Sequence, residues 1–89
     1  MEYYTLVKID DSFNDRYIFA FTHDKVTKLY SRLVKTGEVS ELSWMKILEE
    51  GVYEDKNMVQ NRLWYYMNDY VNEGGYGVIN RGNKYVLSR

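Results

Sequence analysis

The chain has 89 residues, of which 45% are hydrophobic and 17% aromatic, and its formal net charge is −1. This length accommodates one domain, and the many large apolar side chains at near-zero net charge exclude an intrinsically disordered chain. No run approaches the roughly 20 apolar residues of a membrane span, the first residues lack a secretory pattern, and the absence of cysteine excludes disulfides and thiolate metal sites. We therefore expect a single soluble, cytoplasmic domain over residues 1–89.

Two segments near the N-terminus have the composition of β-strands. Residues 3–9 and 16–22 are rich in aromatic and β-branched side chains. The segment between them, residues 10–15, consists mainly of Asp, Ser and Asn, which favour turns. This arrangement predicts an N-terminal antiparallel hairpin.

A helix is predicted next, because the apolar spacing changes from period two to the helical period. Its apolar face consists of Val26, Leu29, Tyr30, Leu33 and Val34. Thr22 or Asp24 is suited to cap its start, and Gly37 is suited to follow its end. Its opposite face carries Lys25, Lys28, Arg32 and Lys35. We interpret these as a solvated face, with a phosphate or acidic-partner surface as the alternative.

Two further helices are expected. The first begins at Ser40, has Trp44, Ile47 and Leu48 on one face, and stops at Gly51. The second begins near Glu54-Asp55 and ends at residues 74–75. Helical geometry places Val59, Leu63, Tyr66, Met67 and Tyr70 on its inner side. The same geometry places Asn57, Asn61, Trp64, Tyr65 and Asn68 on the outer side.

The C-terminal residues predict a second hairpin. Alternating runs around Val78 and over residues 85–87 flank Arg81-Gly82-Asn83, a turn in which Gly and Asn tolerate positive φ. Across all elements, the expected core is Tyr4, Leu6, Ile18, Val26, Leu29, Leu33, Trp44, Leu48, Val59, Leu63 and Tyr85.

This order of elements resembles the winged-helix DNA-binding domain of OmpR/PhoB-type response regulators. Segments 25–48, 53–67 and 75–88 carry the likeness, notably the Val39-Ser40 step and the wing over residues 79–85. The resemblance implies an α+β winged helix, with a three-helix core, the N-terminal antiparallel β-hairpin and a C-terminal β-hairpin wing. We expect no receiver domain of the kind that precedes this module in the family, and the third helix is less basic than is typical there.

The function implied by the resemblance is that of a small DNA-binding transcriptional regulator. Asparagine and glutamine on the third helix would read bases in duplex DNA, and the cations would hold phosphates. The predicted DNA-binding residues are Lys56, Asn57, Gln60, Asn61, Arg62, Arg81, Lys84 and Arg89.

The alternative is a protein-binding module that binds or inhibits a host protein, encoded by a phage or mobile element. Aromatic residues on an exposed helix face are typical of protein interfaces, although Trp64 could also pack beneath the wing. In the resembled family, RNA polymerase is contacted by the loop before the third helix, which makes it the first partner to test. The residues of this alternative interface are Glu49, Glu50, Glu54, Asp55, Trp64, Tyr65 and Asn68. A homodimer is possible in either case.

Catalysis has little support in the sequence. His23 is the only histidine, and no His or Cys accompanies the acidic pairs Asp10-Asp11 and Glu49-Glu50 as a metal ligand. The Gly-rich segment 74–77 follows a helix, whereas a phosphate-binding loop precedes one. We therefore expect no enzyme activity, no metal and no cofactor.

Overall fold

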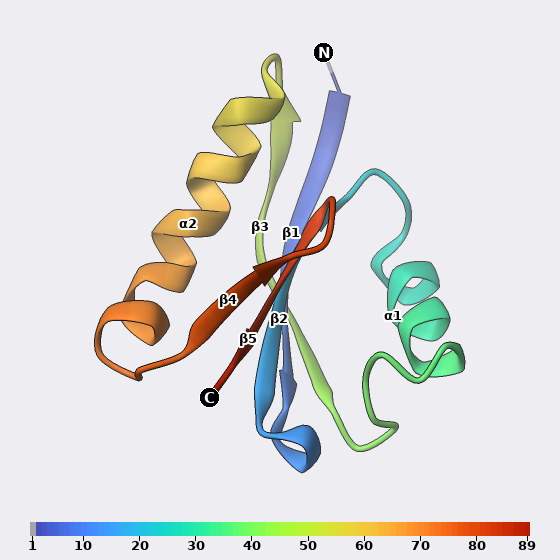
Figure 1. The fold of residues 1–89 in the computed structure, drawn as a ribbon. Coiled ribbons are helices and arrows are strands. Elements are labelled where there is room, and N and C mark those ends of the chain that lie inside the picture. Colours follow the sequence, from blue (N-terminus) through green and yellow to red (C-terminus); the bar gives the residue numbers. More distant parts are fainter. Residues whose placement is uncertain (1) are drawn as a thin grey trace.

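The computed structural model of the chain describes residues 2–89, with only the backbone of Glu2. Its elements are β1 (Glu2–Asp11), the 3-10 helix η1 (Ser12–Asn14), β2 (Arg16–Thr22), α1 (Val26–Lys35), β3 (Trp44–Tyr53), α2 (Lys56–Asn72), β4 (Gly77–Asn80) and β5 (Lys84–Ser88). The strands form one antiparallel sheet in the order β3-β1-β2-β5-β4. α2 covers one face of this sheet and α1 covers the other (Figure 1).

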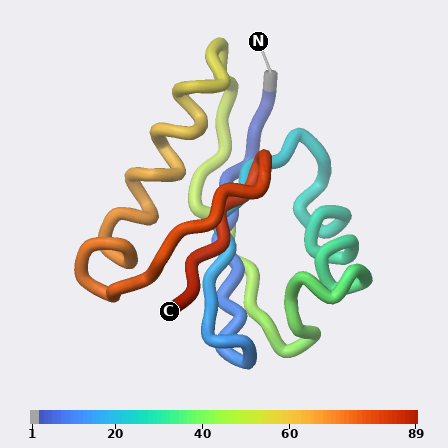
Figure 2. Tube along the Cα trace, viewed as in Figure 1, coloured from blue at the N-terminus to red at the C-terminus, as the bar shows by residue number. Residues whose placement is uncertain are grey.

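The two faces arise from the alternation of side chains along each strand. In β2, Phe19 and Phe21 point to the α2 face, whereas Ile18 and Ala20 point to the α1 face. All four are buried, so the central strand is apolar on both sides and requires a helix on each. The chain meets this requirement by placing α1 on one side, returning through β3, and placing α2 on the other (Figure 2).

Each helix completes its own hydrophobic core. The core on the α2 face contains Tyr4, Leu6, Phe19, Phe21, Val59, Leu63, Met67, Tyr85 and Leu87. The core on the α1 face contains Val7, Ile9, Ile18, Ala20, Leu29, Leu33 and Val39. Of the predicted core, Val26 and Leu48 are only half-buried and Trp44 is exposed, while the other residues are buried.

Gly37 ends α1 as predicted, because its φ of +77° is a conformation that favours glycine. The amides of Gly37 and Glu38 then bond back to the carbonyls of Val34 and Leu33. The start of α1 differs from the prediction. Lys25 occupies the N-cap position without a side-chain bond, and Thr22 accepts a hydrogen bond from the amide of Asp24 one turn earlier.

The structure confirms an α+β domain with hairpins at both ends, and it differs from the predicted three-helix core. Residues 44–53, expected to lie largely in a second helix, form strand β3, and the described chain contains two α-helices, α1 and α2. These lie on opposite faces of the sheet, so they do not form the adjacent pair of a helix-turn-helix (Figure 1). Neither helix is long and apolar enough to cross a membrane.

A β-bulge explains why the apolar spacing of β3 resembles that of a helix. Leu6 pairs with Glu49 and Val7 pairs with Ile47, so Leu48 is an extra residue in β3. The extra residue interrupts the alternation and leaves an apolar spacing of three and four, which is the spacing of a helix.

Candidate functional site

Helix α2 presents the most distinctive surface of the molecule, and local chemistry defines both of its ends. Asp55 caps its start by accepting a hydrogen bond of 2.9 Å from the amide of Asn57. At the other end, a Cβ on Gly74 would lie 2.8 Å from the carbonyl oxygen of Tyr70, so only glycine fits there. Val59, Leu63 and Met67 fix the inner face against the sheet.

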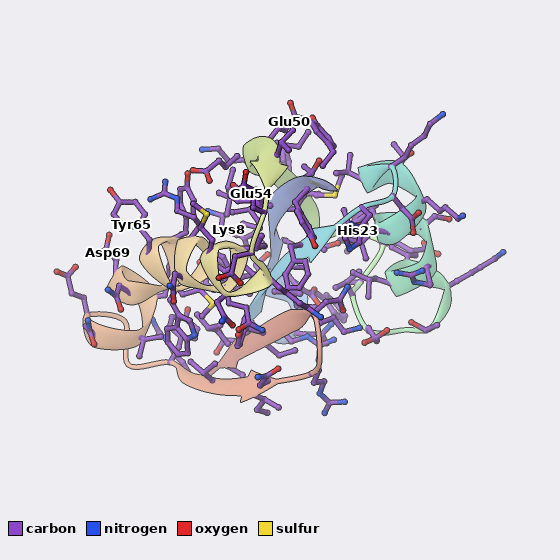
Figure 3. All side chains as sticks on the ribbon, turned by 90° about the horizontal axis from the view of Figure 1, so that it is seen from above. Lys8, His23, Glu50, Glu54, Tyr65 and Asp69 are labelled. Atoms are coloured by element: carbon purple, nitrogen blue, oxygen red, sulfur yellow. The ribbon has the colours of Figure 1, made fainter. Side chains whose placement is uncertain are left out.

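The outer face of α2 has a central row without charged side chains, and the exposed Asp69, one turn after Tyr65, lies at the edge of this row. Helical geometry places six residues on this side, and all six are exposed. We call them the outer stripe: Asn57, Asn61, Trp64, Tyr65, Asn68 and Asn72. In Figure 3, Tyr65 points away from the sheet. The outer stripe therefore combines amides, which can donate and accept hydrogen bonds, with two large aromatic rings.

An ion pair fixes the flank of α2 next to β3. The guanidinium of Arg62 donates from Nη2 to Oε1 of Glu49 at 2.6 Å and from Nε at 3.2 Å. Tyr53 and Tyr66 donate their hydroxyls to the same carboxylate at 2.5 and 2.9 Å. Four hydrogen-bond donor groups therefore converge on one carboxylate of the sheet.

These bonds change the titration of the residues involved. The Arg62 guanidinium, followed by the two tyrosine hydroxyls, lowers the pKa of Glu49 to about 2 despite its partial burial. Burial and the bond to Glu49 raise the pKa of Tyr53 to about 12. Burial and the same carboxylate also raise the pKa of Tyr66. Glu49 is therefore ionised and both phenols are neutral at physiological pH.

Tyr65 is held in place by this network although its ring is 65% exposed. The guanidinium carbon of Arg62 lies 4.6 Å from the ring centroid of Tyr65, within the range of a cation–π contact. The Tyr66 ring lies 5.5 Å from that of Tyr65 in an edge-on arrangement. The exposed Tyr65 ring is therefore in contact with a guanidinium that is itself paired with a carboxylate of the sheet.

Trp64 has a mixed role. Its ring lies 5.6 Å from that of Tyr85 in β5, so one side of the indole packs against the C-terminal hairpin. The residue is nonetheless 38% exposed. The sequence left open whether Trp64 packs against the C-terminal hairpin or lies on the surface. In the structure it does both.

The predicted DNA-binding residues do not form one basic face. Arg62 is paired with Glu49 on the α2 face, whereas Lys84 is paired with Glu38 on the α1 face. The Arg89 guanidinium lies over the ring of Tyr76 at 4.8 Å. Lys56 and Arg81 are exposed cations, and the polar residues Asn57 and Asn61 lie within the outer stripe.

The acidic residues of the alternative interface are also divided. Glu49 is bound within the network described above, and Asp55 caps α2. Glu50 pairs with Thr5 in the sheet and lies on the α1 face. Glu54 is exposed in the turn before α2. Of the predicted interface, Trp64, Tyr65 and Asn68 are the members that share one surface.

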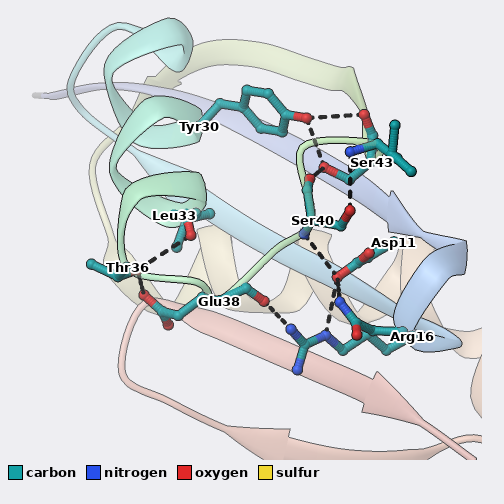
Figure 4. Close-up of polar contacts among 10 residues, drawn as sticks. Asp11, Arg16, Tyr30, Leu33, Thr36, Glu38, Ser40 and Ser43 are labelled. Carbon is teal, nitrogen blue, oxygen red and sulfur yellow. Dashed lines mark hydrogen bonds and ion pairs between the residues drawn. The ribbon is translucent and has the colours of Figure 1, made fainter.

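A buried carboxylate that the sequence analysis did not single out connects three segments on the α1 face. Asp11 is fully buried, and its Oδ2 accepts hydrogen bonds from Asn14 at 2.8 Å, Arg16 at 3.3 Å and the amide of Ser40 at 3.3 Å (Figure 4). Arg16 also donates to the carbonyl oxygen of Glu38. This cluster joins the β1–β2 turn to the α1–β3 connection, which is a structural role.

The sequence also gave no indication of a tyrosine cluster near the C-terminal end of α2. The rings of Tyr17, Tyr70 and Tyr76 lie 4.7 to 6.3 Å apart, and Lys8 donates to the Tyr70 hydroxyl at 3.0 Å. Burial, followed by the charge of Asp10, raises the pKa of Tyr17. The three rings contact one another and also line a shallow, open pocket together with Asp69, Glu73 and Arg89. Their spacing along the sequence gave no signal, because they come from β2, from α2 and from the loop before β4.

Within residues 2–89, no group of three or more acidic or histidine side chains is arranged to hold a metal ion. No known family model, characterised protein or solved structure matches the chain. The molecule is a small α+β domain in which one exposed row of α2, the outer stripe, carries no charged side chain.

Proposed function

We propose that this chain is a non-catalytic protein-binding module, and that the outer stripe of α2 is the surface that contacts the partner. The observation that carries this proposal is the absence of charge along the outer stripe, together with the exposed ring of Tyr65, which Arg62 contacts. The centres of protein interfaces are depleted in charged residues and enriched in Tyr and Trp. The outer stripe has this composition.

The anchoring of Tyr65 supports the same proposal energetically. Binding costs roughly 0.5–1.5 kcal/mol for each flexible side chain that becomes immobilised. Tyr65 avoids much of this cost because Arg62 already holds its ring and Glu49 already holds Arg62. A partner with an apolar pocket for this ring, surrounded by groups that bond the asparagine amides, fits the surface.

The test is affinity capture with the immobilised full chain followed by quantitative mass spectrometry, with RNA polymerase as the first partner to examine. Tyr65→Ala should lose a partner that the wild type captures. Phe13→Ala is the matched control, because Phe13 is another exposed aromatic and lies in η1, away from α2. Asn61→Asp should also lose the partner, since a buried charge without a counterpart is costly. Asn80→Asp, an exposed position on β4, should retain it.

The proposal fails if every captured protein is retained equally by Tyr65→Ala, Asn61→Asp and both controls. Circular dichroism of each variant must show the wild-type spectrum before capture is compared. Because Tyr65 and Asn61 are exposed, both substitutions should leave the fold intact.

Binding to duplex DNA is the second candidate, and the arrangement around Phe21 favours it. Lys56, in the first turn of α2, lies 5.9 Å from the Phe21 ring, and Asn83 of the β4–β5 turn donates to the Phe21 carbonyl at 3.2 Å. This places the exposed Lys56 beside the turn that carries Arg81. One helix end and one hairpin tip could therefore contact neighbouring phosphates.

A gel-shift titration with duplex DNA at low salt tests this candidate, because electrostatic attraction is least screened there. Arg81→Ala should weaken binding to all sequences alike. Arg32→Ala, which removes an exposed cation on α1, is the matched control. An absence of binding at low salt would exclude DNA and leave the protein partner.

A further inference from the structure

Strand β3 forms one margin of the sheet and leaves a long row of backbone groups unpaired. It is ten residues long and pairs with β1 on one side, while no described strand lies on its other side. The opposite margin, β4, is four residues long. Edge strands expose unpaired amides and carbonyls that can add another strand, and proteins commonly keep such strands short. β3 is the margin at which a further strand could be added.

The side chains of β3 are unusually exposed for a strand of this length. None of its ten residues is buried. Trp44, Ile47 and Val52 are 79%, 45% and 57% exposed. Covering apolar surface of this kind contributes roughly 25 cal/mol for each Å² removed from water. An added strand would therefore gain apolar burial as well as backbone hydrogen bonds.

The bulge gives β3 a symmetric pattern of faces. Residues opposite one another in an antiparallel pair point to the same face, so the pairing with β1 assigns each position. On the N-terminal side of the bulge, Trp44 and Lys46 point to the α2 face. On the C-terminal side, Gly51 and Tyr53 do so. Leu48, which packs into the α2-face core, lies beside Glu49 on that same face. Read from either end, the sequence of faces over residues 44–53 is the same.

This symmetry selects the partner strand. A strand with regular alternation can pair with β3 only as β1 does, leaving the bulge residue Leu48 without a partner. A second β3, running antiparallel, carries its own bulge at the same central position and matches all ten residues. We propose that the free margin of β3 pairs with β3 of a second copy of this chain, forming a two-fold symmetric dimer with a continuous sheet.

The face pattern also fixes the register. In this register Trp44 lies opposite Tyr53 of the second copy, and Met45 lies opposite Val52. The residue numbers of every pair add up to 97. The first pair joins two aromatic rings and the second joins two apolar side chains, which are favourable cross-strand pairs. Lys46 lies diagonally across from Glu49 of the second copy, which is a favourable pair of opposite charges.

The dimer has a consequence for the proposed function, although it does not depend on it. Because paired residues share a face, both copies of α2 lie on the same side of the joined sheet. The outer stripes of both copies then face away from the sheet on that same side. A partner with two binding sites would gain affinity through the higher effective concentration at the second site.

The register can be tested by disulfide exchange, because the natural chain has no cysteine. A Met45→Cys chain mixed with a Val52→Cys chain and oxidised with glutathione disulfide should form a disulfide-linked heterodimer, since opposite residues lie about 4.5–5.5 Å apart. Neither chain alone should crosslink, because in this register each residue lies roughly 23 Å along the strand from its own copy. Crosslinking of either chain alone, or none in the mixture, would overturn the register.

Sedimentation velocity over the micromolar range tests the dimer itself. The wild type should sediment as a concentration-dependent dimer. Val52→Lys should raise the dissociation constant by about tenfold or more, because it places a charge opposite Met45 of the second copy. Ile79→Lys, at an exposed apolar position on β4, should leave the dimer unchanged. A wild type that remains monomeric at every concentration would refute the proposal, and capture through the outer stripe would then still be possible.

Discussion

Arg62 of α2 and Glu49 of β3 form a two-pronged ion pair, with Nη2 2.6 Å from Oε1 and Nε 3.2 Å from each carboxylate oxygen. The pair holds the helix to the margin of the sheet, at a position where the bulge turns both Leu48 and Glu49 towards α2. A regular strand would have pointed one of these two residues away. The bulge therefore provides an apolar contact and an ionic contact to the same helix.

The first prediction concerns acid stability. The pKa of Glu49 is lowered from 4.5 to about 2 in the folded chain, so the unfolded chain binds more protons in this range. The stabilising contribution, roughly 1–3 kcal/mol, is complete above the unfolded pKa and is lost as the pH falls through the folded pKa. Glu49→Gln should flatten the pH dependence of the free energy of unfolding between about pH 4.5 and pH 2, measured by urea denaturation. Glu50→Gln is the control, and identical profiles for wild type and Glu49→Gln would contradict the prediction.

The second prediction concerns the buried carboxylate of Asp11. Asp11→Ala should lower the free energy of unfolding by about 1–3 kcal/mol, because it leaves the half-buried guanidinium of Arg16 without its acceptor. It also removes the acceptor for the Ser40 amide. Chemical denaturation measures the loss, and Asp24→Ala, at an exposed position, should cost far less. A loss no greater than that of the control would show that the cluster does not hold the turn.

The third prediction concerns the core beneath α1. Leu33 is 1% exposed, and Leu33→Ala should lower the free energy of unfolding by about 2–5 kcal/mol, the range for a truncated core leucine. Leu63→Ala should cost a similar amount on the other face of the sheet, because each helix completes its own core. Thermal or urea unfolding compares both with Ile79→Ala. A small loss at Leu33 alone would indicate that α1 contributes little to stability.

The fourth prediction concerns the end of α2. Gly74→Ala should lower the free energy of unfolding by about 1–3 kcal/mol, since the added methyl group would meet the Tyr70 carbonyl and force the backbone to shift. Gly77→Ala is the matched control, because its nearest neighbour, the Ser88 carbonyl oxygen, would lie 3.7 Å away. Equal melting temperatures for the two variants would contradict this account.

Local chemistry alone determined several elements of this protein. Both hairpins, the end of α1 at Gly37 and the start of α2 near Asp55 are confirmed, because turn residues, caps and apolar spacing act over a few neighbouring positions. The inner face of α2 was also predicted correctly at Val59, Leu63 and Met67. The outer stripe follows from the same helical spacing.

Only the tertiary structure decided that residues 44–53 form a strand and which charged side chains pair with one another. The spacing of Trp44, Ile47 and Leu48 favours a helix locally, but ten residues of pairing with β1 override it, and the bulge conceals the strand alternation. The pairing of Arg62 with Glu49 and of Lys84 with Glu38 joins residues far apart in the chain. Such long-range contacts leave no local signature, because they depend on which strands become neighbours, and that is fixed when the whole sheet assembles.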